Sequence, residues 1–441
     1  MDFKNKKVLV IGCAKSGEAA AKLLLARGAD ITITDSACIA HKQALQDMGI
    51  AVFDGGHPDF LLDGEWDFIV KNPGIPYHNP FIKKFVEKHT KILTEVEIAY
   101  ACAPRFHYGA ITGTNGKTTI TSILYELLQE NGRALAAGNI GCPLSEQALI
   151  FGEEEKDIAL ELSNFQLLGI DTFRPEVSVV CNLAPDHLDY MDSVEAYYKS
   201  KMRIFKNQHK DDWFLRNVDD PLVMKYAKDI PSTVIDFSLI RQDVDLYRKD
   251  GGIYLHEQLL FHQNDLKIVG DHNVANAMVA ACMAYKLGVS IPSIQKRIKA
   301  FQAVEHRLEY IGERNGVTFY NDSKATNTGA VVTALQSFEK NIILLAGGHD
   351  KGIPFDELKE FDDRIKCCIA FGETRHKFQP IFSHVNICET MKEAFDRAVG
   401  LAAPGDVVVL SPACSSYDQF KNYEERGRIF KAYVLEYLQQ N

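Results

Sequence analysis

The sequence lacks the features of a membrane, secreted or nucleic-acid-binding protein. A membrane span needs about 20 uninterrupted apolar residues, and no stretch of the sequence comes near that length. The segment from Met1 to Lys7 is polar and leads directly into an apolar run. Basic residues are outnumbered, 49 against 59 acidic ones, which argues against general nucleic-acid binding. We therefore expect a cytoplasmic protein with no membrane span and no nucleic-acid partner, in which local groups hold any anionic substrate.

The ten cysteines show no C-x-x-C spacing, and most of them lie in apolar runs. Cys367 and Cys368 are adjacent, a spacing that suits neither a disulfide framework nor a zinc motif. We therefore expect free, mostly buried thiols.

The length of 441 residues is too great for one ordinary core, and a prior of roughly 150 residues per domain suggests three domains. Hydrophobic residues make up 46% and charged residues 24%, as in folded globular proteins. Strand-like and helix-like segments alternate throughout, which predicts an α/β fold. The expected domains are 1–94, 95–303 and 304–441, the first and last Rossmann-like and the central one of P-loop ATPase type.

The segment Ile111 to Thr119, I-T-G-T-N-G-K-T-T, has the composition of a phosphate-binding loop. A buried strand over 106–111 leads into it, and helical spacing of apolar residues follows it. Gly113 and Gly116 let the backbone approach an anion, Lys117 adds a cation, and the hydroxyl of Thr118 is suited to a magnesium ion. The ATP-binding residues predicted here are Gly113, Thr114, Asn115, Gly116, Lys117, Thr118 and Thr119.

Polar residues also follow the other predicted strands of the central domain. The strand over 157–162 runs into a polar segment that begins at Glu161, and the strand over 176–181 leads into a segment that contains His187. Ligands bind at the carboxyl ends of strands in open α/β sheets, so both residues are candidate magnesium ligands. Ser193 is suited to cap a helix that carries Lys201, which would ordinarily be a solvated lysine.

The N-terminal domain opens like a dinucleotide-binding fold. A strand over 7–11 leads into Gly12-Cys13-Ala14-Lys15-Ser16-Gly17, then a helix, then a strand that ends at Asp35. Ala14 stands where the fingerprint has its middle glycine, and its side chain would obstruct a pyrophosphate. On these residues, a nicotinamide site and a purely structural turn both stay open.

Four buried-strand segments of the last domain, 317–320, 342–345, 367–371 and 407–410, are each followed by a polar loop. Loops at the carboxyl ends of parallel strands meet at one edge of a sheet, so these four loops predict a single ligand-binding rim.

The T-G-T-N-G-K-T loop resembles that of the Mur ligases and folylpolyglutamate synthases, which share it. The N-terminal turn, Thr34-Asp35-Ser36, Asn72-Pro73-Gly74-Ile75 and the segment from Gly270 to Asn273 also resemble Mur ligase segments, so the resemblance covers nearly the whole chain. It implies an ATP-dependent ligase that activates a carboxylate as an acyl phosphate and uses two Mg2+ ions. Catalytic roles then fall on Lys117, Glu161, His187 and Lys201.

The resemblance also implies further ligand contacts. Metal ligands would be Thr118, Glu161, His187 and a carbamylated Lys201. Additional nucleotide contacts would be Asn273, Arg307 and Asp322. Contacts with a UDP-linked substrate would be Cys13, Lys15, Ser16, Asp35, Ser36, Asn72, Gly74 and Asn139.

Two segments of the last domain, N-D-S-K-A-T-N and S-P-A-C-S-S-Y-D-Q-F, carry a closer resemblance within the family. This resemblance implies D-glutamate as the acceptor and UDP-N-acetylmuramoyl-L-alanine as the activated carboxylate, a step of peptidoglycan precursor synthesis. The D-glutamate contacts would be Lys324, Thr326, Lys351, Ser416 and Tyr423. Ala14 and His349 depart from the family pattern. We expect a monomer. A nicotinamide dehydrogenase, a nucleotide-binding switch and a ligase of another acceptor, including a folylpolyglutamate synthase, remain alternatives.

Overall fold

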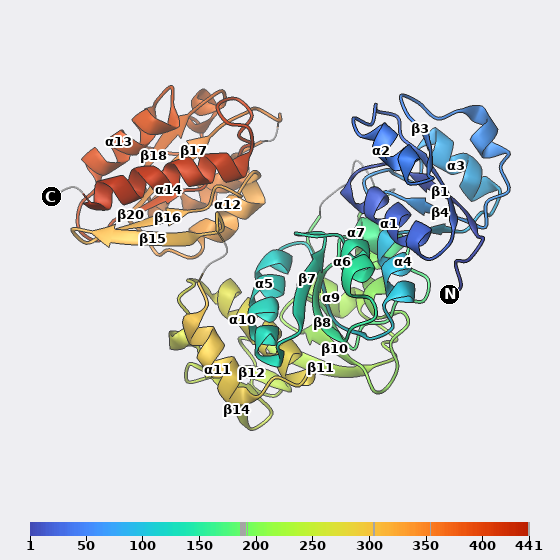
Figure 1. Ribbon diagram of the computed structural model, residues 1–441. Helices are drawn as coiled ribbons and strands as arrows, with labels where there is room; N and C mark the ends of the chain where they lie inside the picture. Colours follow the sequence, from blue (N-terminus) through green and yellow to red (C-terminus); the bar gives the residue numbers. More distant parts are fainter. Residues whose placement is uncertain (186–190, 192, 303–304, 353, 440–441) are drawn as a thin grey trace. The chain divides into compact units, whose positions relative to one another are not determined.

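The computed structural model describes residues 1–441 except 186–190, 192, 303–304, 353 and 440–441. Its strands form three sheets that follow one another along the chain and are mostly parallel (Figure 1). The predicted α/β class is therefore confirmed. Within the described part of the chain, no helix is both long and apolar enough to cross a membrane. All ten cysteines are free, and most are buried.

The N-terminal sheet has five parallel strands in the order β3-β2-β1-β4-β5. Its central strand is a continuous apolar run because helices and loops cover both of its faces. The strands are β1 (Lys7–Ile11), β2 (Asp30–Thr34), β3 (Ala51–Phe53), β4 (Phe68–Lys71) and β5 (Ile92–Leu93). The helices are α1 (Lys15–Ala26), α2 (Lys42–Asp47) and α3 (Pro80–Glu87).

The central sheet has nine strands in the order β14-β13-β12-β11-β10-β9-β6-β8-β7, antiparallel only over the last hairpins. Its strands are β6 (Phe106–Thr112), β7 (Ala134–Gly138), β8 (Lys156–Glu161), β9 (Val177–Val180), β10 (Trp213–Asn217), β11 (Thr233–Ser238), β12 (Leu246–Lys249), β13 (Gly252–Leu255) and β14 (Gln258–His262). The helices are α4 (Glu95–Cys102), α5 (Lys117–Leu128), α6 (Leu144–Phe151), α7 (Asn164–Leu168), α8 (Val194–Met202), α9 (Pro221–Tyr226), α10 (Asp271–Lys286) and α11 (Ile291–Ala300).

The C-terminal sheet has six strands in the order β15-β16-β20-β17-β18-β19, and only β15 is antiparallel to its neighbour. Apolar clusters cover its two faces. The strands are β15 (Glu309–Arg314), β16 (Val317–Asn321), β17 (Ile342–Gly347), β18 (Ile365–Phe371), β19 (Val385–Ile387) and β20 (Val407–Leu410). The helices are α12 (Thr328–Leu335), α13 (Met391–Leu401) and α14 (Tyr423–Gln439).

The chain divides into two compact units. The first holds the N-terminal and central sheets, and the second holds the C-terminal sheet together with residues 264–274. Inside the first unit, α1 packs against α4 and α6, and Arg27 pairs with Glu153 at 2.9 Å across the two sheet regions. The domain boundaries 1–94, 95–303 and 304–441 stay a prediction.

Candidate active site

The phosphate loop joins β6 to α5 and depends on two glycines. Gly113 and Gly116 have φ angles of 147° and 85°, a region that side chains rarely adopt. A Cβ on Gly113 would lie 3.0 Å from the Cβ of Cys181, and one on Gly116 would lie 2.6 Å from Oδ1 of Asn276. The loop can therefore lie this close to its neighbours only with glycine at both positions.

Lys117 begins α5 and folds back over the loop. Its Nζ donates to the carbonyls of Gly113 at 2.9 Å and Thr114 at 2.8 Å. Asn182, which follows β9, holds the loop from the other side. Its Oδ1 accepts from the amide of Asn115 at 2.8 Å, and its Nδ2 donates to the carbonyl of Asn115 at 3.0 Å. These contacts fix the shape of the loop, and sequence analysis missed the part that Asn182 plays.

Glu161 is the last residue of β8, and only one oxygen of its buried carboxylate has a hydrogen-bond partner among the described residues. Its Oε1 accepts from Nδ2 of Asn139 at 2.8 Å. Its Oε2 is buried, and no residue in the described parts of the chain donates to it. A buried carboxylate oxygen without a partner is costly, and Mg2+ prefers oxygen ligands, so the residues fit the expected ion. The structure also places Asn139, predicted to contact the UDP-linked substrate, against Glu161.

Lys201 lies inside the site rather than on a solvated face. Ser193 caps α8 as predicted, accepting from the amide of Ala196 at 3.1 Å. Lys201 is 1% exposed, and its Nζ donates to the carbonyl of Gly113 at 2.8 Å. The ammonium groups of Lys117 and Lys201 therefore meet on one carbonyl of the phosphate loop.

One buried thiol lies within electrostatic range of three of the predicted catalytic residues. Burial raises the pKa of Cys181 to about 12, while the charges of Lys117 and Lys201 lower it and that of Glu161 raises it. These three groups therefore gather near one point. His187, the remaining predicted catalytic residue, lies outside the described residues.

The predicted UDP contacts of the N-terminal sheet gather at the ends of β1, β2 and β4. The amide of Cys13 donates to Oδ2 of Asp35 at 2.6 Å. Nδ2 of Asn72 donates to Oγ of Ser16 at 3.3 Å, and Oδ1 of Asn72 accepts from the amide of Gly74 at 3.0 Å. Lys15 and Ser36 lie exposed on the same two turns.

Lys71, the last residue of β4, was missed by sequence analysis. It is fully buried, and its Nζ donates to the carbonyls of Ile75 at 2.6 Å and Asn72 at 3.1 Å. Burial lowers the pKa of Lys71 to about 7. The lysine therefore fixes the loop that carries Asn72 and Gly74.

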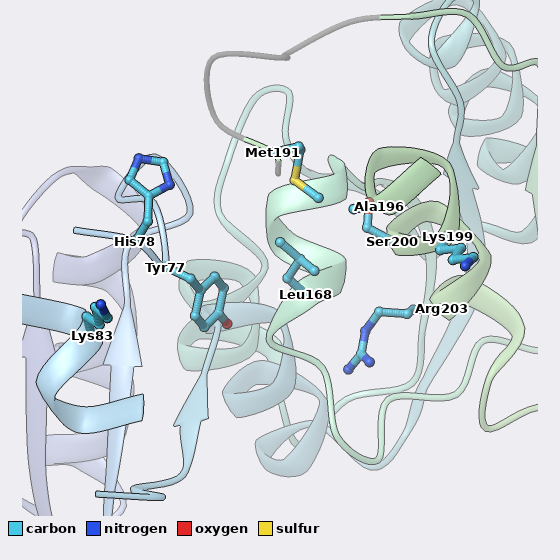
Figure 2. A pocket seen from close by; sticks show the side chains of 9 residues that line it. All are labelled: Tyr77, His78, Lys83, Leu168, Met191, Ala196, Lys199, Ser200 and Arg203. Atoms are coloured by element: carbon cyan, nitrogen blue, oxygen red, sulfur yellow. The ribbon is translucent and has the colours of Figure 1, made fainter. Parts of the chain in front are cut away.

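A pocket of about 660 Å3 opens between the chain after β4 and helices α7 and α8 (Figure 2). Its volume falls within the range of small-molecule sites. Arg203 lines it while donating to the carbonyls of Leu167 and Ile170, both at 2.7 Å. None of the residues predicted to contact the UDP-linked substrate lines this pocket. The lining residues are Tyr77, His78, Lys83, Leu168, Met191, Ala196, Lys199, Ser200 and Arg203.

In the second unit, the predicted rim forms at the carboxyl ends of β16, β17, β18 and β20. Nζ of Lys324 lies 5.4 Å from the ring centroid of Tyr423. Nζ of Lys351 is 3.5 Å from the carbonyl of Thr326, and Ser416 is buried. Four of the five predicted D-glutamate contacts therefore lie side by side in pairs, Lys324 with Tyr423 and Lys351 with Thr326.

The predicted nucleotide contacts of the second unit are largely buried. Asp322 follows β16 and accepts from Oγ of Ser411 at 2.7 Å and the amide of Leu308 at 3.1 Å. Burial raises the pKa of the Asp322 carboxyl, and the charge of Arg307 opposes only part of that rise. Asn273 donates to the carbonyl of Val269 at 2.7 Å.

Arg426 ties two loops of this rim together. It is fully buried in the first turn of α14, and its guanidinium donates to the Oγ of Ser323 at 3.0 Å and its carbonyl at 2.8 Å. The same group donates to the carbonyls of Cys414 at 3.0 Å and Ser415 at 3.3 Å. Burial lowers the pKa of Arg426 to about 10. Sequence analysis missed this arginine because E-E-R-G-R is typical of a solvated helix face.

Asp322 should make the second unit less stable as the pH rises from about 4 to about 7. Burial raises the pKa of Asp322 to about 7 in the folded protein, whereas an unfolded aspartate ionises near about 3.9. Between these values unfolding releases a proton, so the free energy of unfolding falls by up to about 1.4 kcal/mol per pH unit. Urea unfolding across this range should show a steeper fall in the wild type than in Asp322→Asn. If the free energy of unfolding fell equally steeply with pH in both proteins, the raised pKa of Asp322 would be wrong.

The chain matches two family descriptions, Mur ligase middle domain over residues 111–284 and Mur ligase, glutamate ligase domain over residues 306–414. It belongs to the Mur ligase family, as predicted. Within that family it is 43% identical to the UDP-N-acetylmuramoylalanine–D-glutamate ligase of Geobacillus sp. (strain WCH70), over 97% of both chains. The enzyme of the same name from Staphylococcus carnosus (strain TM300) is 41% identical over 97% of this chain and 96% of that one.

Solved structures show the same fold. A pseudomurein peptide ligase type C from Methanothermus fervidus matches with a TM-score of 0.59 at 19% identity, over 98% of this chain and all of the other. The UDP-N-acetylmuramate-alanine ligase of Thermotoga maritima matches with a TM-score of 0.57 at 16% identity, with the same coverage. Family membership confirms the predicted ATP-dependent ligase class and sets aside the dehydrogenase and the nucleotide switch.

Proposed function

We propose that this protein joins the amine of D-glutamate to the carboxylate of UDP-N-acetylmuramoyl-L-alanine at the expense of ATP. The observation that carries the proposal is the phosphate loop with Lys117 and Lys201 on the carbonyl of Gly113, in a chain similar over 97% of its length to a D-glutamate ligase. We further propose that the enzyme acts as a monomer. We place the enzyme in the cytoplasm.

The reaction follows from the chemistry of a carboxylate. Because a carboxylate is a poor electrophile, the γ-phosphoryl group of ATP is first transferred to it, which gives an acyl phosphate. The amine of D-glutamate then attacks the acyl carbon, and phosphate leaves. Negative charge develops on phosphoryl oxygens and then on the tetrahedral carbon's oxygen, and the ammonium of Lys117 is held in advance where it can neutralise the first of these.

The magnesium sites would use side chains of the first unit, most of them with oxygen ligands. Glu161 offers its Oε2, to which no described residue donates, Thr118 offers its hydroxyl next to the phosphate loop, and carbamylation would turn Lys201 into a carboxylate-like ligand. His187 would complete the set. Two bound Mg2+ ions would supply positive charge to the phosphate oxygens, while these side chains hold the ions in place.

Lys201 should carry one added CO2 in the active enzyme, and Lys201→Ala should lose most activity while the fold is retained. A carbamate would give this buried position an anionic oxygen ligand of the kind that Mg2+ prefers. Its remaining N–H can still donate to Gly113. Native mass spectrometry in bicarbonate buffer would detect the adduct, with exposed Lys206→Ala as the control for fold and turnover. An unmodified and dispensable Lys201 would remove it from the proposed metal site.

The function itself is tested by phosphate release from ATP. We expect release only when UDP-N-acetylmuramoyl-L-alanine and D-glutamate are present together, because the acyl phosphate is consumed by the acceptor amine. A panel of acceptor amino acids in the same assay tests the choice of D-glutamate. Phosphate release with another amino acid alone would assign the chain to a sibling reaction.

A further inference from the structure

Three chemically different side chains meet near the N-terminal end of α1. Cys13 belongs to the turn after β1, Glu18 lies in the first turn of α1, and His41 immediately precedes α2. One ligand atom from each lies within 4.8 Å of the other two, and Nε2 of His41 is 2.9 Å from Oε2 of Glu18. The parallel pairing of β1 with β2 brings these distant parts of the sequence together, which explains why the sequence shows no zinc motif.

A thiol, an imidazole and a carboxylate are a zinc ligand set. Zn2+ binds sulfur, nitrogen and oxygen in tetrahedral geometry, and three protein ligands leave one position for water. Mg2+ has no preference for sulfur and would not select this cluster. We propose that Cys13, Glu18 and His41 bind a Zn2+ ion, at a site separate from the magnesium ligands of the central sheet.

The charges around Cys13 favour a divalent cation. Burial is the main cause that raises the pKa of the thiol to about 11, and the negative charges of Glu18 and Asp35 raise it further. Those anions disfavour a lone thiolate, but they attract a cation that would bind the thiolate. Lys22 opposes the cation, because its Nζ lies 2.6 Å from Oε1 of Glu18. Oε2 of Glu18 faces His41, so this oxygen can bind zinc while Oε1 keeps its ion pair with Lys22.

The cluster is partly pre-formed and accessible. The amide of Cys13 is fixed by Asp35 at 2.6 Å, and the amide of Gly12 by the carbonyl of Thr34 at 2.8 Å. The side chain of His41 is 48% exposed, so an ion can reach the site from solvent. The three ligand atoms already lie within 4.8 Å of one another, so binding requires only that they close in around the ion.

Titration of the full-length protein with Co2+ tests the site. Co2+ takes zinc-like geometry, and its bond to a thiolate gives a charge-transfer absorption band in the near ultraviolet. We expect this band to appear with Co2+ and to disappear when one equivalent of Zn2+ is added. Cys13→Ser should abolish the band, whereas Cys38→Ser, which removes an exposed thiol of the same sheet region, should keep it.

Two further variants separate metal binding from folding. His41→Ala should weaken Zn2+ binding at least about 10-fold, since loss of even an indirect partner of a metal ligand costs that much. It should leave ATP-dependent turnover in zinc-free buffer unchanged, because His41 is not among the proposed substrate contacts. Lys22→Met should tighten Zn2+ binding, a gain that misfolding cannot produce. A band that persists in Cys13→Ser, or equal Zn2+ affinity of His41→Ala and the wild type, would overturn the proposal.

Discussion

Lys117→Ala should lower the rate of turnover by about 10² to 10³, equivalent to roughly 3 to 4 kcal/mol of transition-state stabilisation. The ammonium of Lys117 is held on two carbonyls of the phosphate loop, where the β- and γ-phosphates of a nucleotide would lie. Removing it takes away a charge that is already in place when the phosphoryl group moves. Steady-state phosphate release at saturating substrates measures the loss.

The variant should keep its fold, because Lys117 is only partly buried and closes no apolar core. Urea unfolding of Lys117→Ala should therefore resemble that of the wild type. Lys228→Ala removes an exposed lysine of the same sheet region and should leave both turnover and stability unchanged. Turnover of Lys117→Ala close to that of the wild type would invalidate the phosphate-loop assignment.

Lys351→Ala should raise the KM for D-glutamate by an amount equivalent to about 2 to 5 kcal/mol, and change the KM for ATP little. The amine of the acceptor must stay free to attack, so recognition depends on its two carboxylates. Each carboxylate needs a cation or several donors once it leaves water. Lys351 stands beside Thr326 on the rim, which gives one carboxylate a cation.

Lys340→Ala, which removes an exposed lysine of the same unit, is the matched control and should behave as the wild type. D-Alanine should be a poor acceptor because it lacks the side-chain carboxylate. If Lys351→Ala used D-glutamate as well as the wild type does, or if the wild type preferred L-lysine or diaminopimelate, the proposed acceptor would be wrong. The chain would then be assigned to another ligase reaction of the family, with the same ATP chemistry.

Local patterns predicted the secondary structure closely. The strand expected over 7–11 is β1, and Ser193 caps α8 as its residue type suggested. Strands buried on both faces must be continuous apolar runs, so their ends and the polar loops after them are visible in the sequence. The phosphate loop was also recognisable, because its glycines and Lys117 lie within five consecutive residues of the sequence.

Residues that act through distant partners could not be predicted in this way. Lys71 and Arg426 are charged side chains in segments that otherwise resemble a strand end and a solvated helix. Their roles depend on carbonyls that only folding brings to them. The pocket beside α8 was missed because its walls come from separate segments. His187 lies outside the described residues, so its predicted role stays a prediction.

The guanidinium of Arg426 has a consequence for protein engineering. Two of the loops that carry the proposed acceptor contacts are held by one side chain from a helix that follows both of them in the sequence. Grafting those loops into a ligase of different specificity would leave their carbonyls buried without donors unless the start of α14 were transferred with them. The unit of exchange for acceptor preference is therefore the loop pair together with its arginine.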